Sequence, residues 1–267
     1  MVINKPVIGV AAAVIVVAAG TWYYLQSRQA AAPRTPSAAQ MPAPAEPPAE
    51  GAIQHPLPGT EGESATKAPL PALADSDPAL LDALGAVFAP AAVKDYLLPQ
   101  NIVRHMVVTI DNLPRQKVAV DKRPVSPVAG SFVANGDELH ATLDPQNFAR
   151  YQPVVAVVGK LDMLKLAAVY VRFYPLFQHA YQDLGYPNGY FNDRLVQVID
   201  AMLATPQPAG AIDLVRPNVM YLYADPSLES RPAGQKLLIR MGPDNAAAIK
   251  IKLKELRAAI TAAPPKR

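Results

Sequence analysis

Proline is unevenly distributed along this chain, and its distribution limits where a compact core can form. Ten of the 29 prolines fall between Pro33 and Pro71, among mostly Ala, Glu, Gln, Ser and Thr residues. Such a stretch has too little apolar surface to offset the conformational entropy that is lost on ordering. The sequence therefore predicts a disordered Pro/Ala-rich linker over residues 26–72, a single folded domain over residues 73–262 and a tail at 263–267.

A run without charged residues precedes this linker. Residues 7–25, VIGVAAAVIVVAAGTWYYL, would form a helix about as long as the ~30 Å hydrocarbon core of a bilayer. Trp22 and two tyrosines lie at its distal end, where aromatic rings favour the headgroup region. The pattern predicts a single-pass transmembrane helix after a short head at residues 1–6. A secretory signal cleaved near residues 30–32 is the alternative, but the bulky TWYYLQSR sequence is untypical of a cleavage region.

The charges around residues 7–25 are nearly balanced, because the α-amino group and Lys5 precede the run while Arg28 and Arg34 follow it. No further Lys or Arg occurs before Lys67, so we expect the N-terminus inside and the domain outside. In a bacterium this corresponds to an inner-membrane protein with a periplasmic C-terminal domain. A soluble cytoplasmic protein would require that residues 7–25 do not form a span.

Composition and motifs exclude several classes of function. The net charge of +3, with both signs interspersed, argues against a nucleic-acid partner. Since the chain has no cysteine, it has no disulfide, no Cys-ligated zinc and no thiol nucleophile. Zinc-protease, EF-hand, dinucleotide-binding and P-loop motifs are missing from the sequence. We therefore predict no metal, no cofactor and no catalytic residues.

The spacing of apolar residues predicts a mainly helical domain. Asp75, Ser76 and Asp77 offer N-cap oxygens for a first helix that begins near Pro78. A long helix is expected from Asp162 to about residue 184, kinked or broken by its internal proline. The last helix is predicted from an apolar stripe formed by Ile249, Leu253, Leu256 and Ile260.

One segment of this domain has the pattern of strands instead. SFVANGDELHATL, residues 131–143, has short apolar arms around Asn135–Gly136, which predicts a small β-hairpin with its turn at that dipeptide. VMYLYAD, residues 219–225, is compatible with either a strand or the start of a helix. The predicted fold is a compact helical domain with a small β-hairpin.

Five long segments of the domain resemble a known family. They are LPALADSDPALLDAL, VVTIDNLPRQKV, LDPQNFARYQPVV, YPLFQHAYQDLGYPNGYFNDRLVQVIDAMLATP and GQKLLIRMGPDNAAAIKIKLKELRAAI. In this order they are similar to the bacterial domain of unknown function 3014, over nearly all of residues 70–261. The resemblance implies a membrane-anchored proteobacterial protein with a Pro/Ala linker and no established activity, and it supplies no catalytic residues.

The stretch YQDLGYPNGYFNDRL, residues 181–195, has two interpretations. As a turn, it uses Gly185 to end one helix and Asn192 or Asp193 to cap the next. However, it holds more aromatic residues than a turn requires, and recognition surfaces combine aromatic walls with a few polar groups. The candidate partner-binding residues are Tyr186, Tyr190, Phe191, Asp193 and Arg194, joined by Arg150 and Tyr151.

The chemistry of the remaining candidates does not define an enzyme. His179 and Asp183 have the i, i+4 spacing of an acid–base pair, which is also that of an ordinary helix-surface contact. The sequence favours a membrane-tethered periplasmic binding or scaffold module, with an envelope protein or peptidoglycan as partner. The alternative is an envelope hydrolase, for example of peptidoglycan, that uses carboxylates such as Asp193 or Asp200.

Overall fold

The computed structural model describes residues 52–57, 69–88, 95–137 and 140–262. The predicted head, the predicted span at 7–25, most of the predicted linker and the tail lie outside these residues. Within the described ranges, no helix is both long enough and apolar enough to cross a membrane.

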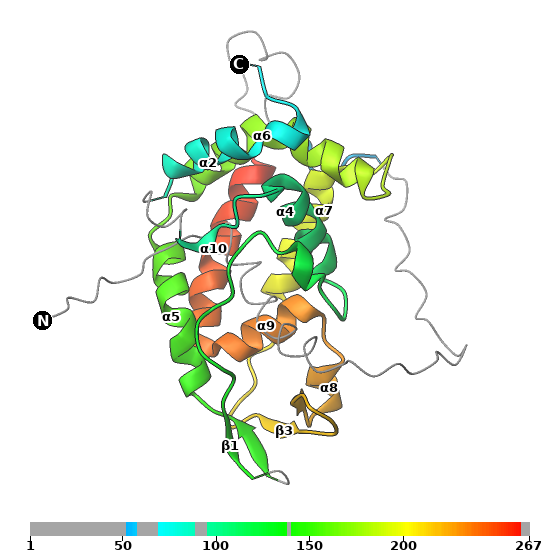
Figure 1. Cartoon of the computed structure of the whole chain (residues 1–267). Helices are drawn as coiled ribbons and strands as arrows, with labels where there is room; N and C mark the ends of the chain where they lie inside the picture. Colours follow the sequence, from blue (N-terminus) through cyan, green and yellow to red (C-terminus); the bar gives the residue numbers. More distant parts are fainter. Residues whose placement is uncertain (1–51, 58–68, 89–94, 138–139, 263–267) are drawn as a thin grey trace, which may run out of the picture.

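The prediction of a mainly helical domain with a small antiparallel β structure is confirmed (Figure 1). Most of the predicted helices are present with bounds close to those expected from the apolar spacing. The helices are η1 Leu73–Asp75, α2 Asp77–Gly85, α4 Ile102–Asn112, η2 Val120–Lys122, α5 Gln146–Gly159, α6 Met163–Asp183, α7 Phe191–Leu203, α8 Pro226–Glu229, α9 Ala233–Met241 and α10 Pro243–Thr261.

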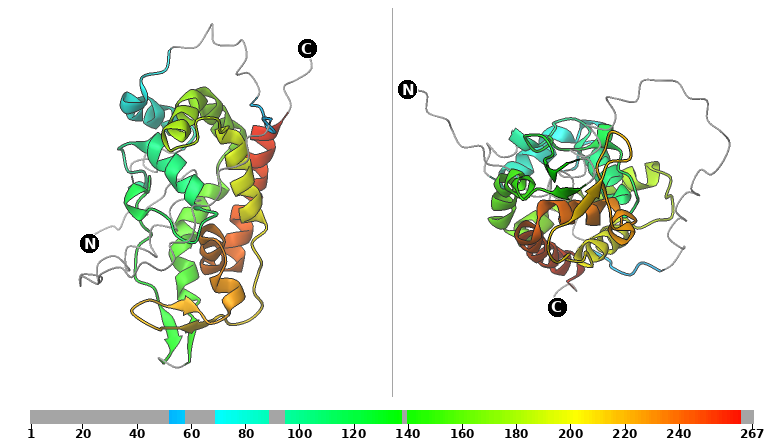
Figure 2. Two further views of the ribbon diagram at one scale, coloured as in Figure 1. Left: turned by 90° about the vertical axis from the view of Figure 1, so that its right-hand side faces the viewer. Right: turned by 90° about the horizontal axis from the view of Figure 1, so that it is seen from below.

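The C-terminal helix α10 packs against α5, α6, α7 and α9. In Figure 1, α5, α7 and α10 run along the length of the domain, α6 lies across one end, and the sheet lies at the other. Figure 2 shows the same arrangement from the side and along the axis. The predicted stripe of α10 faces the core, with Ile249, Leu253 and Ile260 buried and Leu256 partly buried. One hydrophobic cluster thus connects the helices around α10.

The predicted hairpin is present, but its turn is displaced. Strand β1, Ala134–Gly136, pairs antiparallel with β2, Ala141–Leu143, so Asn135 and Gly136 lie in a strand and pair with Thr142 and Ala141. Two further strands, β3 Asp213–Val215 and β4 Leu222–Tyr223, extend it to a four-stranded antiparallel sheet in the order β1-β2-β3-β4. The segment that was compatible with a strand or a helix start therefore contributes an edge strand.

The start of the domain differs from the prediction in its capping. Helix α2 has Ser76 at its N-cap position without a side-chain cap bond. The carboxylate of Asp77 instead accepts hydrogen bonds from the main-chain nitrogens of Asn101, at 2.6 Å, and Ile102, at 2.8 Å. Asp77 thereby satisfies the first amide groups of α4 and ties α2 to it. A local sequence pattern does not reveal that an acidic side chain caps a helix more than 20 residues away.

Helix α6 is continuous through Pro175, so the predicted break does not occur. The residues on either side of this proline, Tyr174 and Leu176, are buried in the core. The carboxylate of Asp162 caps the helix start by accepting from the amides of Leu164 and Lys165, as the position of this residue at the predicted start suggests. Pro175 has no amide hydrogen to donate, which weakens a helix at that point. Packing along the length of α6 compensates for this loss.

Candidate functional site

The connection between α6 and α7 has the predicted turn structure. Gly185 follows the end of α6 with φ +112°, and its amide donates to the carbonyl oxygen of Gln182 at 3.0 Å. The Gly189 amide closes a turn on the carbonyl of Tyr186 at 3.0 Å. Gly189 does not have a positive φ, contrary to what a turn glycine suggests. It is required because a Cβ here would lie 2.7 Å from the ring of Tyr181.

The aromatic side chains of this connection pack mainly against each other. Phe191 is completely buried and stacks on Phe177, with ring centroids 5.8 Å apart. Tyr181 is also buried and stacks on the half-buried Tyr186 at 4.5 Å. Phe191 is a predicted partner-binding residue, but its ring is completely buried and has no surface to offer in this structure. Most of the aromatic residues that a simple turn would not require therefore form a local core.

The hydroxyls of Tyr170 and Tyr174 beneath the connection act as neutral hydrogen-bonding groups, whereas the buried hydroxyl of Tyr181 makes no hydrogen bond with the residues that the structure describes. Burial raises the pKa of Tyr174 and of Tyr170, and it raises the pKa of Tyr181 to about 12. The Tyr174 hydroxyl donates to the side-chain oxygen of Gln178 at 2.8 Å, and the Gln178 amide nitrogen donates to the carbonyl of Gly189 at 2.6 Å. Protonated phenols of this kind position the turn and are unsuited to act as bases at neutral pH.

A buried carboxylate, Asp111 of α4, joins this region to the rest of the domain. Its side chain is 2% exposed and accepts from Arg194 Nε at 3.0 Å and from an Arg115 terminal nitrogen at 2.7 Å. The Tyr186 hydroxyl accepts from the same Arg115 nitrogen at 2.8 Å and lies 3.3 Å from the carboxylate. Arg194 also donates to the carbonyl of Asp111. Arg194 and Tyr186 are both predicted as partner-binding residues. In the structure, Arg194 joins α7 to α4, and Tyr186 joins the α6–α7 connection to the same buried carboxylate and to Arg115.

The first turn of α7 contacts a segment from far earlier in the chain. The Asp193 carboxylate accepts from the main-chain nitrogens of Gln54, at 3.0 Å, and His55, at 2.7 Å. The side-chain nitrogen of Asn192 donates to the carbonyl of His55 at 2.8 Å. The Tyr190 hydroxyl accepts from the amide of Leu57 at 3.1 Å. We call Tyr190, Asn192 and Asp193 the docking face.

The docking face replaces the helix cap that the sequence suggests. The N-cap residue of α7 is Tyr190, which makes no side-chain cap bond. Neither Asn192 nor Asp193 caps the helix, because their side chains bind residues 52–57 instead. Asn192 is itself completely buried and is fixed by the hydroxyl of Tyr170, which donates to its side-chain oxygen at 3.2 Å.

Residues 52–57 fall within the predicted linker, and they are the part of it that packs against the domain. Leu57 is 4% exposed and belongs to the main hydrophobic cluster, whereas Ile53 is 55% exposed. The linker prediction misses this contact because it rests on the composition of the whole Pro/Ala-rich stretch. The signal was local, since IQHPL holds two large aliphatic residues among prolines and small residues.

The two candidates from α5 lie elsewhere. The guanidinium of Arg150 donates to the carbonyls of Ala129 and Gly130, at 3.0 and 2.9 Å, and holds the segment before β1. Tyr151 is 5% exposed, and burial raises its pKa. The structure does not bring Arg150 or Tyr151 to the docking face. The buried ring of Tyr151 presents almost no surface to a partner.

The remaining acid–base candidates make ordinary surface contacts with their neighbours. His179 Nε2 lies 3.5 Å from Asp183, whose carboxylate also accepts from Arg104 at 2.9 Å. Asp200 is held by Arg257 through two bonds of 2.6 and 3.0 Å. In the part of the chain that the structure describes, no group of three or more His, Cys, Asp or Glu side chains is arranged to hold a metal.

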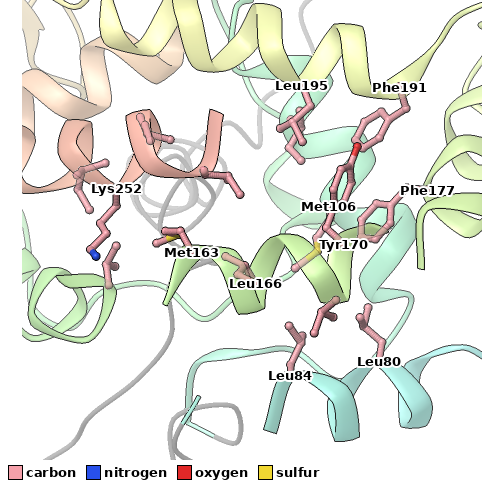
Figure 3. A pocket seen from close by; sticks show the side chains of 16 residues that line it. Leu80, Leu84, Met106, Met163, Leu166, Tyr170, Phe177, Phe191, Leu195 and Lys252 are labelled. Carbon is pink, nitrogen blue, oxygen red and sulfur yellow. The ribbon is translucent and has the colours of Figure 1, made fainter. Parts of the chain in front are cut away.

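An apolar cavity of about 100 Å³ lies between α2, α4, α6, α7 and α10 (Figure 3). Leu80, Phe177 and Phe191 are part of its wall. The polar side chains beside it are engaged elsewhere: Tyr170 donates to Asn192, and Lys252 Nζ donates to the carbonyl of Leu161 at 3.1 Å. The cavity thus presents no polar group to orient a ligand, and we assign it no function.

A second, wider hollow of about 580 Å³ lies between β2, the segment at 205–212, and α9 and α10. Its cation, Lys250, donates to the carbonyl of Thr205, and burial lowers the pKa of this lysine. Phe148 and several prolines contribute to its apolar lining. Its polar lining includes Asn135, Thr142 and Gln207. We assign this hollow no function.

These features define a helical domain with a small terminal sheet, whose most distinctive surface is a helix start that holds an extended chain segment. The family model for a protein of unknown function (DUF3014) matches residues 102–257, which is more than half of the chain. The chain belongs to this family, as the resemblance predicts; the first of the five similar segments, at residues 70–84, lies outside the match. No curated protein and no solved structure matches it.

Proposed function

We propose that this protein is a membrane-tethered binding module of the bacterial cell envelope. Residues 7–25 anchor it in the inner membrane, the chain that follows supplies the tether, and the helical domain works in the periplasm. The uncharged run with its terminal aromatic residues and the charge distribution around it support this topology. The domain binds a partner polypeptide through the docking face.

The observation that carries this proposal is the recognition of main chain by side chains of α7. Asp193 and Tyr190 accept from three main-chain amides of residues 52–57, and Asn192 donates to the carbonyl of His55 as well as to that of Ile260 in α10. These groups are pre-organised on a rigid helix, and main-chain recognition of an extended segment is a recurring mode of peptide binding. A face built in this way is suited to bind a polypeptide rather than a small metabolite.

The hydrolase alternative has no comparable support. Glycoside hydrolysis uses two carboxylates on opposite sides of the scissile bond. Asp193 and Asp200 lie seven residues apart on α7, on the same side of one helix. The first is bonded to two main-chain amides, and the second is bonded to Arg257. We therefore propose binding alone.

Photo-cross-linking in cells tests the proposal. A photo-reactive amino acid at Gln197, one turn after Asp193 on α7, is expected to form adducts with a second, periplasmic polypeptide. The same label at the exposed Asn218, in the connection between β3 and β4 at the opposite end of the domain, serves as the matched control. Adducts are expected from Gln197 and not from Asn218.

The adducts must also depend on the docking face. Combining Tyr190→Phe with Asp193→Asn removes two hydrogen-bonding functions without emptying the core, so the melting temperature should stay near that of the wild type. We expect at least a tenfold loss of adduct in this double variant. Adducts of equal yield in the double variant, or adducts to cytoplasmic proteins only, would contradict the proposal.

A further inference from the structure

We propose that residues 52–57 are an exchangeable intramolecular ligand of the docking face. Their contacts also indicate which chemical features a partner needs in order to bind there. That partner is an extended polypeptide segment with free amides at two successive residues and a leucine-sized side chain two residues later. This inference rests on the proposed function and adds to it the ligand class and a competitor within the chain.

The main-chain contacts define which positions of a ligand need an amide. Asp193 accepts from the amides of Gln54 and His55, and Tyr190 accepts from that of Leu57. Between them lies Pro56, which has no amide to offer. A proline also biases the residue before it toward extended backbone. The proline thus stands at the position where it removes no contact and pre-orders the segment.

A single side chain supplies the apolar anchor. Leu57 is 4% exposed and joins the main cluster, whereas the side chains of Ala52, Ile53 and Gln54 are exposed. Binding to the main chain leaves these exposed positions free to vary. Selectivity among extended segments therefore comes from the aliphatic residue at the position of Leu57 and from the requirement for amides at 54, 55 and 57.

The connection to the domain makes the resident segment a competitor. Only residues 58–68 separate Leu57 from the next described residue of the domain. A tether of about this length gives an effective concentration on the order of millimolar. If the resident segment alone has a dissociation constant of about 0.1 mM for the face, this effective concentration exceeds it about tenfold, and any partner segment would bind roughly tenfold more weakly than to an empty face. Partner binding and docking of residues 52–57 exclude each other.

The experiment uses the full chain in detergent and a fluorescent peptide with the sequence of residues 50–59, EGAIQHPLPG. Fluorescence anisotropy measures its affinity for the wild type and for Leu57→Ser, which releases the resident segment. We expect the peptide to bind the released variant at least tenfold more tightly than the wild type. Adding Asp193→Asn to Leu57→Ser should reverse this gain.

Two controls keep the result interpretable. If Leu57→Ser lowers the melting temperature, His55→Pro in the chain removes one amide at Asp193 while the leucine anchor remains. In the peptide, His55→Pro should weaken binding at least tenfold, whereas Ile53→Ala should change it less than threefold because Ile53 is exposed.

The outcomes separate this inference from the proposed function. Equal peptide affinity for wild type and released variants would overturn the competition, although peptide binding itself would stand. No binding by any variant, with Gln197 adducts still formed in cells, would overturn the ligand class alone. A wild-type dimer that dissociates in Leu57→Ser would show that the segment belongs in a second copy, which contradicts an intramolecular ligand.

Discussion

Replacing Asp111 with alanine is expected to lower the free energy of unfolding by about 3–5 kcal/mol. The carboxylate is buried between Arg194 and Arg115, with the Tyr186 hydroxyl beside it. Its removal leaves the Arg194 guanidinium, whose side chain is 12% exposed, without its charged partner. A desolvated cation without a counter-charge is far more costly than the pair itself is stabilising.

Urea denaturation of the purified chain measures this effect, and Asp200→Ala provides the matched control. Asp200 also bonds to an arginine, but it is 48% exposed, so its removal should change stability by at most about 1 kcal/mol. Asp111→Asn should fall between the two, because it keeps the shape and one acceptor while it loses the charge. A change below about 1 kcal/mol for Asp111→Ala would show that Asp111 does not join α4 to α7.

Replacing Phe191 with alanine is expected to destabilise the domain by about 3–5 kcal/mol. The ring is completely buried, stacks on Phe177 and lies 5.4 Å from Tyr181 between ring centroids. It also borders the apolar cavity, so the space left by the ring would enlarge an existing void. Any loss of partner binding in this variant should therefore follow the loss of folded protein.

Tyr190→Phe is the comparison for this second prediction, since it alters the neighbouring residue by one hydroxyl. Tyr190 is partly exposed, and its hydroxyl accepts from the Leu57 amide. We expect a melting temperature close to that of the wild type together with weaker docking of residues 52–57. A Phe191→Ala variant that melts like the wild type and fails to bind its partner would instead make Phe191 part of the recognition surface.

Much of the fold was predictable because the helices carry their own signals. The apolar stripe of α10, the Asp162 cap of α6 and the Gly185 ending of that helix are local patterns, and each is present in the structure. The hairpin was expected from its apolar arms, yet its turn was misplaced by the Asn135–Gly136 dipeptide. A turn preference is a weak signal where strand pairing decides the register.

The docking face was not predictable in the same way, because its contacts join residues more than 130 positions apart. Asn192 and Asp193 look like caps of their own helix, as Asp75 to Asp77 do for α2. In both cases the structure uses an acidic side chain to bind the main chain of a distant segment. Similarly, nothing in the sequence around Asp111 indicates that its carboxylate is buried with Arg194.

Amide hydrogen exchange tests the docking of residues 52–57 most directly. The amides of Gln54, His55 and Leu57 are each bonded to the docking face, so all three should exchange at least tenfold more slowly than in an unstructured peptide of the same sequence. In the Tyr190→Phe, Asp193→Asn double variant, the same amides should exchange at nearly the rate of that peptide, while the core of α10 remains protected. Unprotected amides at Gln54 and His55 in the wild-type chain would contradict the existence of the docking face and the binding function built on it.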